Sequence, residues 1–511
     1  MILTQTGAGA LVPGCGRRIG RTIGRSTRPS IGRSLGRRIT ALAWALVPMA
    51  TAPAAAAPQN GFTAPPAGRG VTSPAPASAT AADTTGLQEL VQRALAVNPG
   101  IKAALDRAAA ARARIGPTGA RPDPILMAGV INLPVRSLSF TEDEMTMKMV
   151  GVEQILPYRG KLGLRQRIAK LEADEAMVIA DSVRLAVVRD VKTAYYEIAY
   201  IDAAIAIAER NRGILGDVIR LASARYAAGS GAQQDILRAT LDATRLNESA
   251  NAFREQRLAA VARLNTLLDR PTDTSIGSPV IPFRLARAAV AELPADIRFT
   301  SQALGASATG SPLPTLDELE AVALQTSPAI RASRAKASAA AAGLELARKD
   351  HLPDIQFSVQ YGQRSGSSVM EHGVRSSRSD MVSAVVSLPI PLQRARKQNA
   401  LVAASRSDLS AIEAERRDAE NMVRANVARL HSDIQRSRTQ LALYVKAIIP
   451  QSRAVVASAT SAYTSGTGDF RTVLQAQMTL LEIEYAYHRS LADFAQKVAE
   501  LEAVAGTDVI R

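Results

Sequence analysis

The sequence predicts a mainly helical protein with a small β part, built from two copies of one helix–β-hairpin–long helix–helix unit. Three observations predict this fold class. Short motifs recur at a nearly constant spacing, two very long segments contain no proline, and each half holds two strand-like runs bounded by proline. Because proline interrupts both helices and strands, its positions mark where the elements begin and end.

The internal duplication is visible at two places. The first motif is Leu87-Gln-Glu-Leu90 with Ala94-Leu95 and Asn98-Pro99, and 229 residues later it recurs as Leu316-Asp-Glu-Leu319 with Ala323-Leu324 and Ser327-Pro328. The second is Tyr226-Ala-Ala-Gly229-Ser-Gly231 with Leu237, and at an offset of 237 it recurs as Tyr463-Thr-Ser-Gly466-Thr-Gly468 with Leu474. Two agreements at nearly the same offset indicate a tandem repeat of structural units far longer than those of a solenoid.

The first repeat is assigned to residues 87–269 and the second to 315–506, with a proline-containing linker at 270–314. In the first repeat we expect a helix at 87–118, strands at about 124–133 and 145–156, a long helix at 160–228 and a helix at 232–268. In the second repeat we expect a helix at 315–350, strands at about 354–363 and 381–390, and a proline-free long helix at 394–449 that ends at Pro450.

The helix lengths indicate how the units are arranged. At a rise of about 1.5 Å per residue, the segment 160–228 forms a helix about 100 Å long. The two shorter helices of the same repeat, placed end to end, span about the same length. Alanine, leucine, arginine and glutamate dominate these segments, and small alanines allow helices to pack closely side by side. The pattern therefore predicts a cylinder wall in which one long helix runs beside two short ones.

The N-terminal segment reads as a secretory signal peptide over residues 1–57. Residues 1–38 hold eight arginines and no acidic residue, an apolar run follows at 41–50, and Ala54–Ala57 supply a cleavage site near Ala57. Residues 58–86 are rich in proline and alanine, which predicts a disordered lead-in. The one cysteine, Cys15, stands in a weak lipoprotein-like sequence inside this leader, so both lipidation and a start codon downstream of Met1 stay open.

Composition argues against several classes of function. The formal net charge of +16 falls to +8 without the eight leader arginines, and no basic stripe with interleaved aromatics supports nucleic-acid binding. The four histidines lack metal-ligand spacing, and a methionine stripe on the predicted strand 145–156 reads as one apolar face. No catalytic constellation or phosphate-binding loop is present, so we predict neither an enzyme nor a cofactor. No run reaches the roughly 18 apolar residues of a membrane-spanning helix, so a membrane location requires strands that close into a barrel.

The order of these features resembles that of the TolC-type outer-membrane efflux proteins, over essentially all of residues 87–506. The resemblance rests on the duplication, on the opening motifs at 87–102 and 316–331, and on the two glycine turns. It also rests on the strand exit Glu153-Gln-Ile-Leu-Pro157-Tyr-Arg-Gly160-Lys161, echoed at Ser387–Arg396. This strand exit loosely resembles the heavy-metal branch of proteins that serve proton-driven pumps of the RND kind.

The resemblance implies a homotrimer in the outer membrane with a long periplasmic extension. Four strands from each protomer would close a twelve-stranded barrel in outer-membrane lipid, above a long periplasmic α-helical barrel. The chain would then be the passive, gated channel of a tripartite efflux system. Its partners would be a periplasmic adaptor and an inner-membrane pump of the RND or ABC type, which deliver small toxic compounds or metal ions.

The resemblance also places a gate at the glycine turns, which would form the periplasmic tip. The candidate site residues are Gly229, Gly231, Asp235, Gly466, Gly468 and Asp469. Asp235 matches a lumen-facing carboxylate of relatives, whereas the matching second-repeat positions hold Thr472 and Gln475, so the acidic pair often found there is missing. For Asp235 and Asp469, a simple role as acids at a helix N-terminus is an equally good interpretation.

Two other functions stay open at this point. One is the exit duct of a type I protein secretion system, which has the same architecture. The other is a non-channel periplasmic coiled-coil scaffold, which would have no use for four strands of about ten residues bounded by proline.

Overall fold

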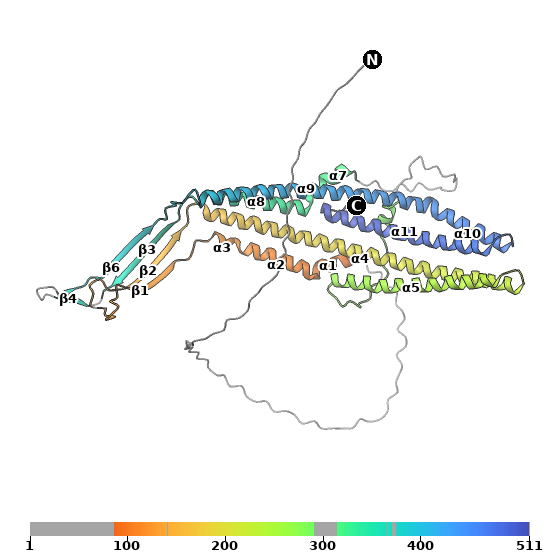
Figure 1. The fold of residues 1–511 in the computed structure, drawn as a ribbon, viewed down its shortest axis with the longest axis horizontal. Coiled ribbons are helices and arrows are strands. Elements are labelled where there is room, and N and C mark those ends of the chain that lie inside the picture. Colours follow the sequence, from red (N-terminus) through yellow and green to blue (C-terminus); the bar gives the residue numbers. More distant parts are fainter. Residues whose placement is uncertain (1–85, 141, 291–313, 365, 370–374, 510–511) are drawn as a thin grey trace, which may run out of the picture. The chain divides into compact units, whose positions relative to one another are not determined.

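The computed structural model describes residues 86–290 and 314–509, except for 141, 365 and 370–374. The predicted signal peptide, nearly all of the lead-in and most of the second half of the linker lie outside the described residues. The described chain is mainly helical with one four-stranded sheet, which confirms the predicted fold class. Its elements follow the same order in both halves, with the strands at one end of the long helices and the hairpin turns at the other (Figure 1).

The helix before the strands is broken in each half, where the sequence predicted one continuous helix. The first half has α1 (Leu87–Val97), α2 (Pro99–Ala113) and α3 (Ile115–Gly119), and the second has α7 (Leu316–Thr326) and α8 (Pro328–Lys349). The breaks fall at Asn98-Pro99 and Ser327-Pro328, because proline has no N–H to continue the preceding helix but fits the first turn of the next. The Asn98 side chain caps α2 by accepting hydrogen bonds from two backbone N–H groups.

The long helices are continuous over many turns. They are α4 (Lys161–Ala227) and α5 (Gln233–Leu267) in the first half, and α9 (Gln398–Leu443), η1 (Tyr444–Ile448), α10 (Ile449–Thr464) and α11 (Phe470–Ala505) in the second. A short helix, α6 (Phe283–Ala288), lies in the linker. Pro450 does not end the second long helix as the sequence predicted. The π-helical turn η1 precedes it, so the missing N–H falls in the first turn of α10 and the helix continues.

The sheet joins the two halves. It is antiparallel with the order β1 (Ile125–Ile131), β2 (Met147–Leu156), β3 (Ile355–Gln363) and β6 (Met381–Ser387). The connection between β3 and β6 holds a further small hairpin, β4 (Ser367–Val369) and β5 (Arg375–Ser377), which the sequence had read as loop. Strands β1 and β6 are the free edges of the sheet within the chain.

The two faces of the sheet differ in chemistry. The register aligns Leu126, Val152, Val359 and Ala384 across the four strands, and their neighbours at every second position are mostly apolar. The opposite face is mixed: besides glycines, serines, glutamines and Glu153 it carries isoleucines and the methionines of β1, β2 and β6. The methionine stripe of β2 therefore lies on this mixed face and not on the apolar face that the sequence had suggested. Many side chains of the apolar face are exposed in the single chain, among them Leu126, Val150, Tyr361 and Val386. The apolar face is therefore suited to lipid and the other face to water.

The helices form a layer in which α4 has neighbours on both sides. It packs against α2 and α5 of its own half and against α8 and α11 of the other half, whereas α9 packs against α7, α8 and α11. One apolar cluster joins the middle of these helices, and a second lies nearer the hairpin turns around Leu215, Phe470 and Leu481. Both clusters are rich in small and aliphatic side chains, as a thin wall requires.

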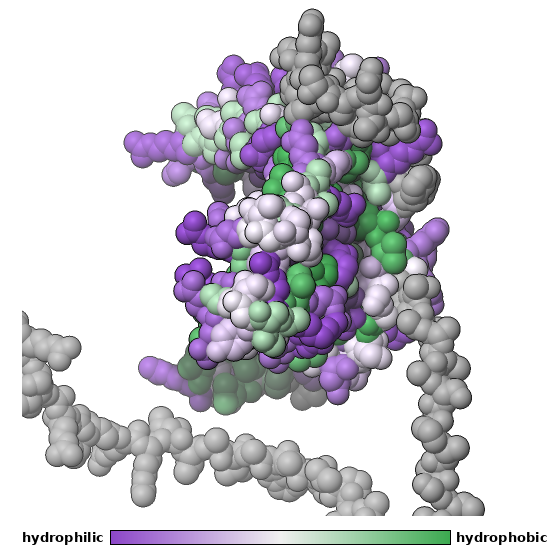
Figure 2. All heavy atoms as spheres, turned by 90° about the vertical axis from the view of Figure 1, so that its right-hand side faces the viewer, coloured by the Kyte–Doolittle hydropathy of each residue, from purple (hydrophilic) through white to green (hydrophobic). Residues whose placement is uncertain are grey.

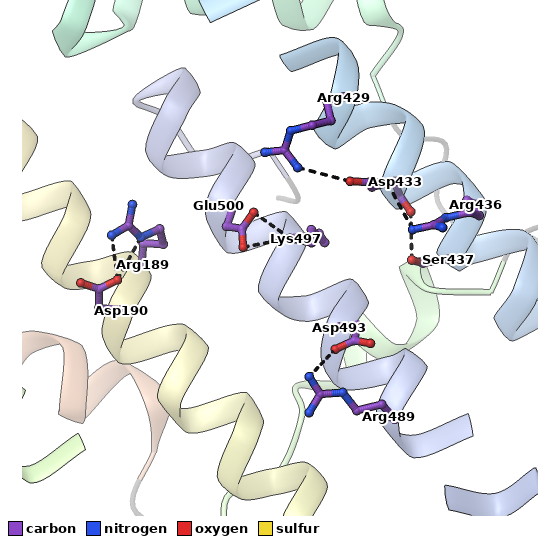
Figure 3. A network of polar contacts seen from close by, with 10 residues as sticks. All are labelled: Arg189, Asp190, Arg429, Asp433, Arg436, Ser437, Arg489, Asp493, Lys497 and Glu500. Atoms are coloured by element: carbon purple, nitrogen blue, oxygen red, sulfur yellow. Dashed lines mark hydrogen bonds and ion pairs between the residues drawn. The ribbon is translucent and has the colours of Figure 1, made fainter. Parts of the chain in front are cut away.

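Many charged residues on the helix surfaces pair within one helix, and others pair between neighbouring helices. Figure 3 shows pairs of the first kind on α4, α9 and α11, where Arg489 lies 2.9 Å from Asp493 and Lys497 lies 3.0 Å from Glu500. Spacings of three or four residues bring such partners together on the surface of a helix, where each pair adds only a few tenths of a kcal/mol. These pairs mark solvated faces of the helices.

Candidate functional site

Both hairpin turns end their first helix with the same backbone motif. The chain leaves α4 through Gly229 at φ 74° and leaves α10 through Gly466 at φ 83°. In the first turn, Ser230 N–H donates to the Arg225 carbonyl and Gly229 N–H donates to the Tyr226 carbonyl, both at 2.9 Å. The second turn repeats these bonds 237 residues later. This is a Schellman motif, and its left-handed residue favours glycine at both positions.

The second glycine of each turn is required for a different reason. A Cβ on Gly231 would lie 2.9 Å from the Tyr226 nitrogen, and one on Gly468 would lie 2.8 Å from the Ala462 Cβ. Any larger residue would push the chain away from the helix it has just left. All four candidate glycines therefore build the two tight tips, which Figure 2 views end-on with hydrophilic side chains around their margin.

The two candidate carboxylates start the second helix of each hairpin. Asp235 lies half-buried in the first turn of α5, and exposed Asp469 is the N-cap residue of α11. The Asp469 side chain caps no backbone N–H and instead lies 3.8 Å from Arg471. Both carboxylates act on the same partner, since they add to the burial that raises the pKa of Tyr463. The charges of both carboxylates therefore act on one tyrosine.

Arg225 joins the two tips, and the sequence analysis had not singled it out. Its guanidinium lies 4.5 Å from the centroid of the Tyr463 ring and donates to the Tyr463 carbonyl of the second hairpin. It also donates to the Ser230 carbonyl of its own turn, at 3.5 Å. A partly buried cation–π contact with two hydrogen bonds is a strong local tie.

The tyrosine that begins the repeated turn motif is buried in the second turn and exposed in the first. Tyr463 is 5% exposed and packs edge-on against Phe470 at 5.4 Å, whereas Tyr226 is 49% exposed. Arg225 directly precedes the tyrosine of the first turn, but the second turn has Ala462 at that position, so the repeated motif does not mark Arg225. The burial of Tyr463 depends on contact between the two halves, which the local sequence does not encode.

Two further polar contacts join the hairpins above the tip. Asn211 of α4 and Gln477 of α11 are buried and share a hydrogen bond of 2.6 Å. About two turns further along α11, buried Glu484 is paired with Arg210 of α4 and lies 3.4 Å from Arg453 of α10. Asn211, Gln477 and Glu484 are buried, whereas Arg210 and Arg453 are exposed. Loss of a partner would therefore leave a buried amide or carboxylate with fewer hydrogen bonds. The hairpins are therefore tied at three levels.

A groove runs between α10 and α11 near these ties. Its volume is about 440 Å³, and it is lined by Ile448, Gln451, Ser452, Val455, Thr472, Gln475, Ala476 and Thr479. No charged side chain lines it. The groove includes Thr472 and Gln475, the two positions that the sequence analysis matched to acidic residues of relatives. Its surface is therefore mixed polar and apolar without a fixed charge.

Among the described residues, no group of three or more His, Cys, Asp or Glu side chains is placed to hold a metal ion. Among the same residues, no helix is both long and apolar enough to cross a membrane.

Known proteins match this chain over both halves of its fold. The family model described as "outer membrane efflux protein" matches residues 90–270 and 320–507. The curated protein CyaE of Bordetella pertussis (strain Tohama I) is 26% identical over 394 residues, which are 74% of this chain and 76% of CyaE.

Solved structures share the fold at lower identity. The outer-membrane channel OprN has a TM-score of 0.66 at 19% identity, with 83% of this chain and 91% of OprN covered. The outer membrane protein VceC of Vibrio cholerae has a TM-score of 0.64 at 18% identity, with 83% and 96% covered. CusC has a TM-score of 0.64 at 16% identity, with 82% and 92% covered.

Proposed function

Because the chain belongs to the outer membrane efflux protein family, we propose that it is the channel of a tripartite efflux system. Family membership places it in the outer membrane as a channel protein and not an enzyme. In the proposed system it is a passive duct. An inner-membrane pump and a periplasmic adaptor deliver small toxic compounds or metal ions to its helical end.

The observation that carries this proposal is the sheet with two unlike faces and two free edges. An apolar face fits lipid, and the mixed face, with Glu153 and its glutamines and serines, fits a water-filled interior. A free edge in lipid leaves backbone groups without partners, at a cost of several kcal/mol each. Pairing β6 of one copy with β1 of the next removes both edges, and three copies would give the predicted twelve-stranded closure.

The helical layer supports assembly of the same copies. Positions of α5 that are exposed correspond, at the repeat offset of 237, to buried positions of α11: Leu237 is 63% exposed and Leu474 is 7% exposed. Leu258, at 61%, corresponds to Ala495, at 1%. The α11 positions are covered by α4. The equivalent contact for α5 is made with α10, and this helix comes from a second copy. Repeating this contact head to tail closes a ring of copies.

The tied hairpin tips are the proposed gate of the duct. Arg225 and Tyr463 form its direct contact, and Asp235 and Asp469 add negative charge near Tyr463. The four turn glycines hold the hairpins tight enough for this contact to form. An adaptor that binds the tips and separates α10–α11 from α4–α5 would open it. Selection of cargo by the duct is expected to be weak, because a water-filled passage makes few desolvated contacts.

A cellular export assay tests the function. Cells that lack the chain are compared with cells that carry it, and the intracellular accumulation of toxic dyes and of divalent metal salts is measured. The proposal predicts higher accumulation of at least one small compound without the chain, restored by the intact gene. Unchanged accumulation of every compound, together with loss of a secreted polypeptide, would instead indicate a protein secretion duct.

A further inference from the structure

Positive charge is concentrated at three of the four junctions between strands and helices, all except the one that precedes β3. Segments 107–124, 157–172, 345–354 and 388–406 together hold fifteen Lys and Arg residues against five Asp and Glu. Elsewhere in residues 86–511, acidic and basic residues are nearly equal in number. Each segment directly precedes or follows one strand of the four-stranded sheet, so the fold gathers them at one level. We call these four segments the junction belt.

Most cations of the junction belt are exposed and have no acidic partner. The exposed ones are Arg107, Arg112, Arg114, Arg121, Arg159, Arg167, Lys170, Arg348, Arg394, Arg396, Lys397 and Arg406. Within the part of the chain that the structure describes, Lys161 alone among the belt cations forms ion pairs. This differs from the helix surfaces further along, where arginines and lysines pair with carboxylates on their own helix (Figure 3). The belt therefore presents charge that is not neutralised by the chain.

Large apolar side chains are exposed among these cations. Leu392 is 90% exposed and Ile390 is 75% exposed, two and four residues before Arg394, and Tyr158 precedes Arg159. Apolar and aromatic residues next to basic ones are typical of the boundary between hydrocarbon and headgroups. A water-filled passage would offer Ile390 and Leu392 no partner. The junction belt therefore has the composition of a surface that faces lipid headgroups.

One part of the belt forms a groove of suitable chemistry. Between α2, α4 and α8 lies a cavity of about 610 Å³ whose lining includes Arg107, Arg114, Arg165 and Glu172. Apolar side chains such as Ile168 and Leu346 complete the lining. Three guanidinium groups against one carboxylate favour an anion with several acceptor oxygens, and the apolar wall favours one that carries hydrocarbon.

We propose that the junction belt binds the headgroups of anionic phospholipids in the leaflet next to the helices. The proposal rests on insertion of the sheet in the outer membrane, as the proposed function requires, and adds a lipid partner to it. The lipid phosphate takes hydrogen bonds from arginine, and Ile390 and Leu392 lie against the acyl chains. Such contacts fix the depth of the sheet in the membrane and the level at which the helices leave it.

The test measures lipid binding by the purified full-length protein in neutral detergent micelles. Phosphatidylglycerol or phosphatidylcholine is titrated, and bound lipid is counted by native mass spectrometry. Each basic residue near an anionic surface contributes about fivefold to binding. The triple variant Arg394→Gln, Arg396→Gln, Lys397→Gln should therefore bind phosphatidylglycerol about tenfold or more weakly. A matched triple at the hairpins, Arg212→Gln, Arg220→Gln, Arg238→Gln, should bind it as the unsubstituted protein does.

Three results would overturn the proposal: equal binding of both lipids, equal loss in the two triple variants, or displacement of phosphatidylglycerol by an equal concentration of inorganic phosphate. A second variant set, Arg112→Gln, Arg114→Gln, Arg121→Gln, repeats the test if the first fails to fold by circular dichroism. Conductance in a bilayer of phosphatidylcholine alone separates the two proposals. A conducting protein without preference for phosphatidylglycerol contradicts the belt only, and a non-conducting protein that binds phosphatidylglycerol contradicts the duct only.

Discussion

Arg225 is the residue on which the proposed gate depends most directly. It contacts the ring and the carbonyl of Tyr463 and so spans the two hairpins of one chain. A partly buried cation–π contact contributes about 1–2 kcal/mol. The tie uses the ring and the backbone of Tyr463, so Tyr463→Phe should preserve it.

We predict that Arg225→Ala raises the ratio of open to closed channels about tenfold, which corresponds to a loss of about 1.4 kcal/mol. The measurement is the open probability of single channels in a planar bilayer. Arg220→Ala is the matched control, since Arg220 lies on the same helix and pairs with Asp217 of that helix. Equal open probabilities in the two variants would contradict a role of Arg225 in closure.

A second residue-scale feature fixes the junction between sheet and helices. Buried Lys161 lies 2.9 Å from Asp354 and 3.3 Å from Asp350, and donates to the Leu352 carbonyl at 2.7 Å. Asp354 also accepts from the Tyr158 backbone N–H. Partial burial acts to raise the pKa of Asp354, but these hydrogen bonds outweigh it and hold the pKa below its ordinary value. The pair connects the start of α4 to the segment that enters β3.

A lowered pKa makes this contribution to stability depend on pH in a defined direction. The stabilisation is complete above the ordinary aspartate pKa of about 4. It is lost as the pH falls through the lower pKa of folded Asp354. The difference in thermal unfolding temperature between the unsubstituted protein and Asp354→Asn should therefore be constant from pH 7 to 5 and shrink below pH 4. If the difference in unfolding temperature for Asp354→Asn were unchanged at pH 3, the lowered pKa of Asp354 would not be its cause. The same conclusion would follow if the exposed control Asp106→Asn lowered the unfolding temperature equally.

At the scale of elements, the repeat offset predicts which helices meet between copies. Within one chain, Asn211 contacts Gln477. Adding the offset of 237 to Asn211 gives Ile448, and subtracting it from Gln477 gives Thr240. We therefore expect Ile448 of one copy to meet Thr240 of another. We predict that Thr240→Cys with Ile448→Cys, in a chain with Cys15→Ser, joins separate chains through a short bismaleimide. The measurement is the mass of denatured products on a gel.

The matched control for this experiment is Asn211→Cys with Gln477→Cys. Because these residues touch within one chain, their cross-linked product should keep the mass of a monomer. The inter-copy pair should instead give bands of two and three chains. A pair that stays monomeric in a protein already shown to be trimeric would mean that α5 and α10 do not face each other.

The elements also show what the sequence determines and what it does not. Long helices could be predicted from the absence of proline and the strands from proline-bounded runs, because both signals act locally. The continuation of the second long helix through Pro450 could not be predicted. It depends on the π-helical turn η1, which only the surrounding packing stabilises. The glycine turns could be found from their repeated pattern. Arg225 could not, because its importance comes from a tyrosine 238 residues away.

At the scale of the whole molecule, one chain provides parts that are incomplete alone. The sheet has free edges and an exposed apolar face, and α5 has leucines with no cover. Each of these surfaces has a complement elsewhere on the same chain, so copies arranged head to tail satisfy all of them. We therefore propose that the chain functions as a ring of identical protomers around a gated passage.

Single-channel conductance of the purified protein, with its mass determined in the same detergent, tests this claim most directly. We predict the mass of three chains and small, discrete openings in a planar bilayer that become more frequent in Arg225→Ala. A protein that remains a stable monomer or dimer and conducts no current, alone or with this substitution, would contradict the account.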